Sequence, residues 1–304
     1  MPHLLNLTDL GREGLITLVK SAERFRARRQ QSLGDSPIAG KTVALVFEKA
    51  STRTRVSLEI AVAELGGHPV VIDGSKSQMA RGEPIRDTAR VLSRMVHAIT
   101  FRTGATTRLE EMAHYSSVPV LNALTDDGHP MQLLADLMTV RQVHGSLDGL
   151  RYAWVGDGNN MANSWIEAAG LLGLTLSLAC PAGYAPDAAV VDRAAALGAN
   201  LNITADPREA VEGADVVSTD VFTSMGQEAE QDARRKAFSG MMVSRTLLQL
   251  ANPGHIVLHC LPAHRDEEIE AEVLEGPRSF VWDQAEARLH TAKSALLWAM
   301  GLDG

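Results

Sequence analysis

Residues 42–67 read TVALVFEKASTRTRVSLEIAVAELGG, and this stretch decides the fold. Thr42–Phe47 is a β-branched and aromatic run typical of a strand, and residues 56–65 place apolar side chains at helical spacing before a Gly-Gly pair. Between these two elements, Ser51–Arg55 packs hydroxyl and guanidinium side chains into consecutive positions. The stretch therefore predicts a strand, a polar turn and a helix, which together begin a parallel α/β unit.

The Ser51–Arg55 cluster lies at the predicted N-terminus of the helix. There the first backbone N–H groups lack intrahelical partners and the helix dipole is positive, so an oxyanion finds both donors and a favourable field. Serine and threonine add hydroxyl donors, and arginine adds a planar fork that matches phosphate oxygens. A helix cap with solvated arginines would explain a single Ser or Arg. The density of donors favours a phosphate site.

Strands and helices alternate along both halves of the chain. In the first half we expect strands at 42–47, 69–72, 98–101 and 118–122, and helices at 15–27, 56–65, 85–96 and 109–115. In the second half we expect strands at 151–155, 175–179, 214–218 and 255–259, and helices at 163–172, 187–197, 244–250 and 286–300. This rhythm predicts an α/β fold of two Rossmann-like parallel-sheet domains flanking an interdomain cleft.

A chain of 304 residues exceeds what one core usually covers, which also favours two domains. We expect a first domain at 1–130, a connecting helix at 131–145, and a second domain at 146–285. Ligands of parallel sheets gather at the carboxyl ends of the strands. The polar cluster of the first domain and Arg102 both follow predicted strands.

Composition excludes several classes of partner. The net charge of −8, from 29 basic and 37 acidic side chains, argues against nucleic acid and anionic membranes. Cys180 and Cys260 fit neither a metal-ligand spacing nor a disulfide framework, which favours a reducing compartment. No segment reaches the roughly 18 apolar residues of a membrane span, and the N-terminus shows no basic leader. We expect a cytoplasmic protein.

The stretch Gly156–Asn160 follows a predicted strand and superficially matches a dinucleotide-binding turn. The match is poor because Met161 stands where the third glycine is needed. The next strand also leads into Cys180 instead of an acidic residue that would bind ribose. We therefore expect no nicotinamide cofactor, and we interpret Asn160 as an amide presented to a polar ligand.

His129 and Gln132 stand between a predicted strand end and the connecting helix. Pro130 fixes the start of that helix, so both side chains can point toward a ligand from its first turn. A lone histidine is more often structural than catalytic. The position of His129 beside the predicted phosphate site favours a functional role.

Two further groups follow strands of the second domain. Asp220 can bind an ammonium group, although its spacing fits an Asx-turn equally well. Cys260 can be a buried small hydrophobe, a nucleophile or a polar contact for a substrate. A nucleophilic role would need a base and an orienting group that the sequence does not reveal, so burial is the default.

These motifs resemble the aspartate and ornithine carbamoyltransferase family, and the similarity runs from His3 to the C-terminal helix. Ser51–Arg55 is similar to the carbamoyl-phosphate signature that both branches share. Gln78 stands where ornithine enzymes carry glutamine and aspartate enzymes usually carry lysine. Ser224-Met225-Gly226 is similar to a loop of the ornithine branch. The resemblance implies that the C-terminal helix at 286–304 returns to the first domain and completes it.

The resemblance also implies a reaction, in which the carbamoyl group moves from carbamoyl phosphate to the side-chain amine of L-ornithine to give citrulline and phosphate. It assigns catalysis to Arg102, His129 and Cys260, with the cysteine as a positioning contact. Carbamoyl phosphate would contact Ser51, Thr52, Arg53, Thr54, Gln78, Arg102, His129, Gln132 and Arg288. Ornithine would contact Asn160, Asp220, Ser224, Met225, Cys260 and Leu261. No metal or cofactor is expected, because the substrate supplies the nucleophile and the phosphate is already activated.

The family resemblance further implies a homotrimer, or a higher assembly of trimers, in which Gln78 reaches a neighbouring subunit. The chain departs from the usual pattern at Ala287, at Met131 and in the loop after Arg102. A relative that acts on putrescine or an N-acylornithine is therefore an alternative, as is a non-catalytic carbamoyltransferase-like subunit. Retained Asp220 favours an acceptor with a free amino-acid backbone.

Overall fold

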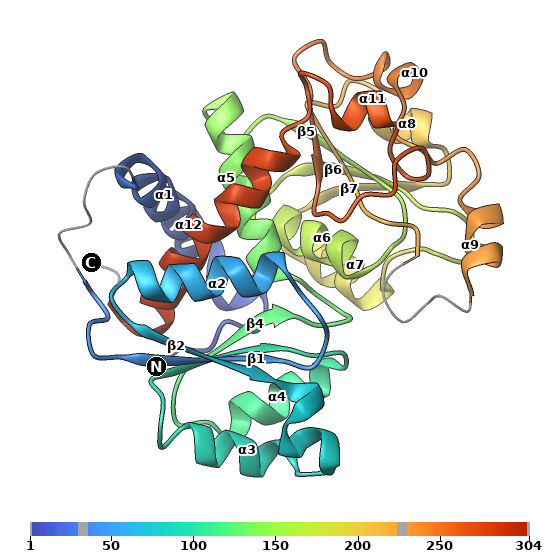
Figure 1. Ribbon diagram of the computed structural model, residues 1–304. Coiled ribbons are helices and arrows are strands. Elements are labelled where there is room, and N and C mark those ends of the chain that lie inside the picture. Colours follow the sequence, from blue (N-terminus) through green and yellow to red (C-terminus); the bar gives the residue numbers. More distant parts are fainter. Residues whose placement is uncertain (1, 30–35, 224–229, 303–304) are drawn as a thin grey trace. The chain divides into compact units, whose positions relative to one another are not determined.

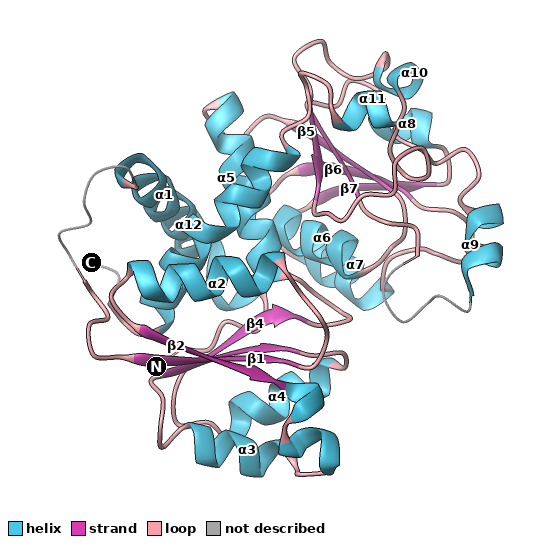
Figure 2. Ribbon diagram, viewed as in Figure 1, coloured by secondary structure: helices cyan, strands magenta, loops and turns pink. Residues whose placement is uncertain are grey.

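The computed structural model describes residues 2–29, 36–223 and 230–302. Contacts divide the chain into unit 1, which is Met1–Met138 with Glu286–Gly304, and unit 2, which is Thr139–Ala285. Each unit is an α/β layer structure around one parallel sheet (Figures 1 and 2). The predicted α/β class with two parallel sheets is confirmed. Within the described residues, no helix combines the length and the apolarity that crossing a membrane requires.

Unit 1 contains a four-stranded sheet in the order β2-β1-β3-β4. Its strands are β1 (Thr42–Phe47), β2 (His68–Asp73), β3 (Ala98–Arg102) and β4 (Val120–Leu124). Its helices are α1 (Gly11–Arg28), α2 (Arg53–Glu64), α3 (Ile85–Leu92) and α4 (Thr106–Tyr115), with short 3-10 turns at Leu7–Asp9, Gly74–Lys76 and Gln78–Arg81. Helices α3 and α4 cover one face of the sheet and α2 the other (Figure 1).

Unit 2 contains a five-stranded sheet in the order β7-β6-β5-β8-β9. Its strands are β5 (Arg151–Val155), β6 (Thr175–Ala179), β7 (Asn200–Thr204), β8 (Val216–Thr219) and β9 (Ile256–His259). Its helices are α6 (Asn160–Leu172), α7 (Ala188–Ala196), α8 (Pro207–Val211), α9 (Gln231–Ala237), α10 (Arg245–Leu248) and α11 (Ala271–Leu274). Helices α5 (Pro130–His144) and α12 (Val281–Ala299) each run from one unit into the other.

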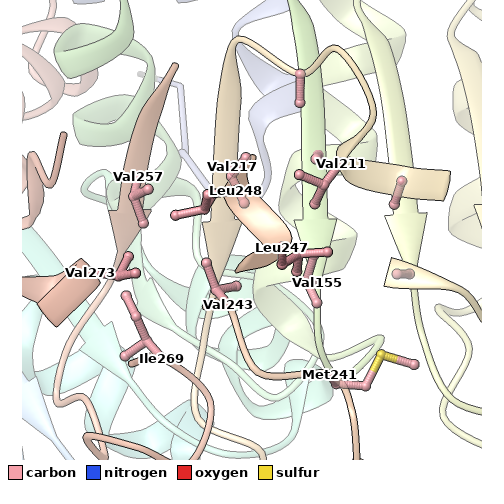
Figure 3. Packing of buried hydrophobic residues seen from close by; sticks show 14 of the residues in the cluster. Val155, Val211, Val217, Met241, Val243, Leu247, Leu248, Val257, Ile269 and Val273 are labelled. Carbon is pink, nitrogen blue, oxygen red and sulfur yellow. The ribbon is translucent and has the colours of Figure 1, made fainter. Parts of the chain in front are cut away.

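In each unit, apolar side chains of the sheet pack against apolar side chains of a layer of helices. In unit 1, Val46 and Phe101 of the sheet pack with Leu109 and Met112 of α4. In unit 2, Val155, Val217 and Val257 project from three strands toward α8, α10 and α11; Figure 3 shows this packing around Leu247 and Val273. Burial of this apolar area is the main favourable contribution to the stability of each unit.

Both sheets reverse their strand order once. In unit 1 the chain runs from β1 to β2 on one side and then continues with β3 on the other side of β1. In unit 2 it runs from β5 through β6 to β7, and then returns to β8 on the other side of β5. Ligands of open parallel sheets bind outside the carboxyl ends of the strands at such reversal points. Ligands are therefore expected at the ends of β1 and β3 and at those of β5 and β8.

Most expected elements are present, with two informative differences. Strand β7 was not expected, because it is an edge strand with asparagines and mostly exposed side chains, and so lacks the apolar pattern of a buried strand. Helix α2 begins at Arg53, not at residue 56, so the polar cluster itself forms its first turn. Residues 131–140 of α5 are buried on every side.

Candidate active site

In unit 1 the polar cluster occupies the junction between β1 and α2. Thr52 is the N-cap residue and has helical backbone angles, and its side chain makes no capping hydrogen bond. Arg53 and Thr54 are the first two residues of the helix. The N–H groups of this first turn point out of the helix end without intrahelical acceptors, as the phosphate-site prediction requires. Ser51 is half-buried and Thr52 is exposed.

The Thr54 hydroxyl joins three elements that are far apart in the sequence. Its Oγ1 accepts a hydrogen bond from Arg288 Nη2 of α12 at 2.6 Å and from Arg102 Nη1, at the end of β3, at 3.3 Å. All three side chains are at least 93% buried. Two guanidinium groups thus converge on one neutral hydroxyl, which concentrates positive charge at the ends of β1 and β3.

His129 lies immediately before α5 and is 4% exposed. Its carbonyl oxygen accepts the N–H of Gln132 at 3.0 Å, so both residues belong to the first turn. Burial, together with the positive charges of Arg288 and Arg102, holds the pKa of His129 well below the ordinary value of 6.5. His129 is therefore a neutral imidazole at neutral pH, able to donate one hydrogen bond without adding charge.

Gln132 is 1% exposed and lies one helical turn before Asp136, which is fully buried. The amide nitrogen Nε2 of Gln132 donates to Asp136 Oδ1 at 2.8 Å. The other end of the same amide, Oε1, is buried and makes no hydrogen bond to a described residue. This turn of α5 thus contains a buried acceptor.

Glu48 connects the loops that follow β1 and β3. Its carboxylate accepts hydrogen bonds from Arg108 Nε at 3.0 Å, from Arg108 Nη2 at 2.5 Å and from Thr103 Oγ1 at 2.5 Å. Its backbone N–H donates to the carbonyl of Arg102 at 2.9 Å. These bonds tie the loop before the polar cluster to the residue that approaches Thr54, and so help to fix Arg102 relative to α2.

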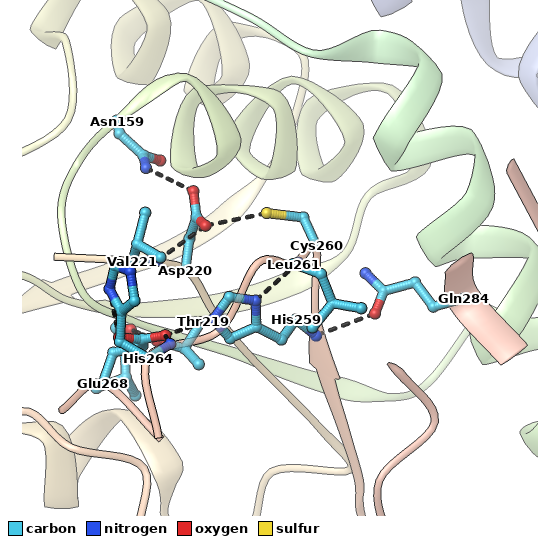
Figure 4. A network of polar contacts seen from close by, with 11 residues as sticks. Asn159, Thr219, Asp220, Val221, His259, Cys260, Leu261, His264, Glu268 and Gln284 are labelled. Atoms are coloured by element: carbon cyan, nitrogen blue, oxygen red, sulfur yellow. Dashed lines mark hydrogen bonds and ion pairs between the residues drawn. The ribbon is translucent and has the colours of Figure 1, made fainter. Parts of the chain in front are cut away.

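In unit 2 the residues that follow β8 and β9 meet at Asp220 (Figure 4). The Asp220 carboxylate is 7% exposed and accepts hydrogen bonds from Cys260 Sγ at 3.0 Å and from Asn159 Nδ2 at 3.0 Å. It also accepts the N–H of Val221 at 2.8 Å. An Asx-turn involves the backbone two residues further on, so the side chain of Asp220 instead joins three strand ends.

The geometry bears on the alternatives for Cys260. Its thiol donates to a carboxylate, and a neighbouring negative charge disfavours the thiolate that nucleophilic attack requires. A polar contact therefore fits better than a nucleophile. Cys180, by contrast, is a buried structural thiol, because burial, aided by Asp157, raises its pKa to about 12.

His259 and Glu268 support the turn that carries Cys260 (Figure 4). His259 Nε2 lies 2.9 Å from Glu268 Oε1, and both side chains are fully buried. His259 Nδ1 accepts the N–H of Leu261 at 2.9 Å. Asp220, His259 and Cys260 have metal-ligating atoms within 4.8 Å of one another. Both ring nitrogens of His259 already have hydrogen-bond partners, so the trio is better described as a hydrogen-bond network than as a metal centre.

A buried ion pair lies beside this network. Arg234 of α9 donates to Asp157, after β5, and to the carbonyl of Phe222, after β8, the latter at 2.6 Å. Its guanidinium also lies 4.8 Å from the ring centre of Tyr184. Burial raises the pKa of Asp157, and the Asp220 carboxylate adds to this effect while Arg234 opposes it. Arg234 therefore holds together the loops that follow β5 and β8.

The structure brings together several of the residues that the sequence singled out within each unit. Thr54, Arg102 and Arg288 share hydrogen bonds, and His129 is close enough for the two arginines to lower its pKa. Gln78 is exposed on the turn Gln78–Arg81. Ser224 and Met225 lie outside the described residues.

Sequence reasoning missed several members of these networks. The amide that contacts Asp220 belongs to Asn159, whereas Asn160 begins α6. Asp136, Glu48 and Arg234 were also missed, because each acts through a partner that is distant in the sequence or one helical turn away. For Asp136, the spacing of four residues from Gln132 was an available signal.

Comparison with known proteins fits both halves of this arrangement. Residues 2–142 match the family described as aspartate/ornithine carbamoyltransferase, carbamoyl-P binding domain, and residues 148–300 match the corresponding Asp/Orn binding domain. This chain belongs to the aspartate/ornithine carbamoyltransferase family. The carbamoyltransferase family resemblance drawn from the sequence is confirmed.

Individual carbamoyltransferases agree over nearly the whole length. The ornithine carbamoyltransferase of Geobacter sulfurreducens is 53% identical over 97% of both chains. The crystallised ornithine carbamoyltransferase of Thermus thermophilus is 44% identical, covers 98% of both chains and superposes with a TM-score of 0.90. The ornithine carbamoyltransferase structure from Pyrococcus furiosus is also 44% identical, covers 99% of this chain and 97% of that one, and gives a TM-score of 0.94.

Proposed function

We propose that this protein transfers the carbamoyl group of carbamoyl phosphate to the side-chain amine of L-ornithine, giving L-citrulline and phosphate. The observation that carries the proposal is the convergence of Arg102 and Arg288 on Thr54, at the strand-order reversal of unit 1 and beside the first turn of α2. About half of the sequence is also shared with ornithine carbamoyltransferases along nearly the full chain.

Unit 1 would bind carbamoyl phosphate. The first turn of α2 offers backbone N–H groups to the phosphate, and the site residues add charge and hydroxyl donors. The residues proposed to contact this substrate are Ser51, Thr52, Arg53, Thr54, Gln78, Arg102, His129, Gln132 and Arg288. Residues 1–130 with 286–304 would form the carbamoyl-phosphate domain, and 131–145 the connecting helix.

The reaction builds negative charge on the carbonyl oxygen as the amine attacks the carbamoyl carbon and phosphate departs. Donors aimed at that oxygen stabilise the transition state more than the ground state. Arg102, neutral His129 and Thr54 are the proposed donors, and Arg53 with the α2 N-terminus stabilises the leaving phosphate. Each well-placed donor contributes on the order of 3–4 kcal/mol. The amine attacks directly, so no covalent enzyme intermediate is needed.

Unit 2, residues 146–285, would bind ornithine. The Asp220 carboxylate suits an ammonium group, and its contacts with Asn159 and Cys260 fix its position. The proposed ornithine contacts are Asn160, Asp220, Ser224, Met225, Cys260 and Leu261. The attacking amine has an intrinsic pKa of about 10.4 and must lose a proton first, so the rate should rise with pH through the neutral range.

We also infer a cytoplasmic homotrimer that serves arginine metabolism. Gln78 is exposed on unit 1, which suits a contact with a neighbouring subunit. Sedimentation of the purified protein tests the assembly, and a fully active monomer would contradict the role of Gln78.

The test of the activity is citrulline formation by the purified protein with carbamoyl phosphate, using L-ornithine, putrescine, N-acetylornithine and aspartate as parallel acceptors. Of the four acceptors, we expect only ornithine to be carbamoylated. Preference for another amine would keep the carbamoyl-phosphate half of the proposal and overturn the ornithine half. Absence of turnover with every acceptor would favour a non-catalytic carbamoyltransferase-like protein.

A further inference from the structure

We infer that Asp136 is a positioning residue that makes the protein specific for carbamoyl phosphate over acyl phosphates, by fixing the amide of Gln132 with its oxygen toward the substrate. The inference rests on the proposed function. Asp136 lies one helical turn beyond Gln132 on the same side of α5, and it does not belong to the set of substrate contacts.

The amide orientation follows from the chemistry of the two side chains. The nitrogen of the Gln132 amide faces Asp136, and an amide NH₂ donates where a carboxyl oxygen accepts. The 2.8 Å contact between Nε2 and Asp136 Oδ1 has this polarity. The carbonyl oxygen Oε1 must then point away from Asp136. With Asp136 fully buried, water does not compete for this arrangement.

The other end of the Gln132 amide is a buried hydrogen-bond acceptor. Gln132 Oε1 is buried and makes no hydrogen bond to the residues that the structure describes. A buried acceptor left unpaired is costly, so a ligand that donates to it gains affinity and one that cannot is rejected. Gln132 shares the first turn of α5 with His129, whose pKa is lowered by the nearby charges of Arg288 and Arg102.

The carbamoyl group has the matching chemistry. Carbamoyl phosphate carries an NH₂ where acetyl phosphate carries a methyl group of similar size, so the two differ mainly in hydrogen-bond donors. A glutamine free to rotate its amide could present NH₂ or oxygen and would discriminate poorly. The buried carboxylate removes that choice. Shape cannot separate the two substrates, whereas a fixed acceptor can.

The test compares three ligands on wild type and on Asp136→Asn. Measured quantities are the KM for carbamoyl phosphate, the inhibition constant of acetyl phosphate and the dissociation constant of inorganic phosphate. Asparagine can donate as well as accept, so it releases the constraint on Gln132. We expect the KM for carbamoyl phosphate to rise about 10- to 100-fold, with acetyl phosphate and phosphate changing less than about threefold.

Further variants separate positioning from a structural effect. Gln132→Met should lose the same preference, and adding Asp136→Asn to it should change the preference no further. Asp87→Asn is the matched control, because this carboxyl lies on α3 with its side chain 48% exposed. If Asp136→Asn does not fold, Asp136→Ser carries the same expectation, since serine also removes the acceptor-only partner.

The outcomes are distinguishable. If binding of all three ligands weakened equally, Asp136 would only support the fold. If the preference for carbamoyl phosphate over acetyl phosphate stayed unchanged, Asp136 would not orient Gln132. Either result overturns the inference. Wild-type protein that turns over no carbamoyl phosphate would instead contradict the proposed function itself.

Discussion

The two strand-end sites are built on the same sheet geometry with opposite electrostatics. In unit 1, Arg102 and Arg288 converge on the neutral Thr54 hydroxyl. In unit 2, Arg234 is paired with Asp157, and Asp220 receives hydrogen bonds from neutral donors. The first site concentrates cations, and the second neutralises its arginine and retains a carboxylate. A phosphate dianion suits the first and an ammonium group the second.

This difference separates two uses of a buried arginine. Arg234 has a carboxylate partner whose side chain is only 11% exposed, so the loss of Arg234 leaves a mostly buried charge uncompensated and should affect folding. Arg102 points to a hydroxyl at the end of a strand, so its loss should affect ligand chemistry more than folding. Substitution of each arginine tests that separation.

The largest expected effect is on stability and comes from Arg234→Met. Removing one partner leaves Asp157 buried without its cation, so the free energy of unfolding should fall by about 3–5 kcal/mol. Chemical denaturation measures this value. Arg235→Met is the matched control, because this neighbouring side chain is 67% exposed and its substitution should change stability by less than about 0.5 kcal/mol.

Adding Asp157→Asn to Arg234→Met should restore part of the lost stability, because the uncompensated charge is then gone. A loss below about 1 kcal/mol in the single variant would show that Asp157 does not depend on its cation.

The next effect is on catalysis and comes from Arg102→Met. Removing a donor to the developing oxyanion should lower kcat by about 10²–10³, with the midpoint of denaturation nearly unchanged. Steady-state kinetics with saturating ornithine measure it. Arg86→Met, at an exposed position of α3, should keep wild-type rates. If Arg102→Met retained the wild-type kcat but unfolded more easily, Arg102 would have the structural role that is assigned here to Arg234.

A smaller effect is expected from Asp220→Asn, which keeps the shape of the side chain and removes its charge. Loss of a charge-assisted hydrogen bond of about 1.5–3 kcal/mol should raise the KM for ornithine roughly 10- to 100-fold. The dissociation constant of inorganic phosphate should stay the same, because phosphate would bind in unit 1. Equal weakening of both ligands would contradict the division of labour between the units.

The smallest effect concerns pH and His129. Its pKa is lowered in the folded protein, so between that value and about 6.5 the unfolded chain binds a proton that the folded chain does not. Stability therefore falls as the pH drops below about 6.5 and is complete above it. The free energy of unfolding of His129→Asn, measured as a function of pH, should fall less steeply below about pH 6.5 than that of the wild type. The difference in slope corresponds to at most one proton. His68→Asn, at an exposed position of β2, is the control; an unaltered slope in His129→Asn would reject the assignment.

The sequence predicted those features that depend on local pattern. Hydrophobic period and helix-start chemistry were enough for β1, for the polar first turn of α2 and for the parallel α/β class, because each is set by residues within about ten positions. Edge strand β7 was not predicted, because its exposed polar residues lack the apolar pattern that indicates a buried strand. Resemblance to a family supplied Arg288, which no local pattern could connect to a turn more than two hundred residues earlier.

What the sequence determined by itself is therefore the class of fold and the kinds of donor and acceptor present, because local propensity and side-chain chemistry are properties of single residues and short segments. Only the tertiary structure decided that Arg102 and Arg288 share Thr54, that Asn159 contacts Asp220, and that Gln132 donates to Asp136. Those contacts depend on strand order and on which side of a helix is buried. Hydrogen bonds need placement within a few tenths of an ångström, and packing of the whole unit supplies it.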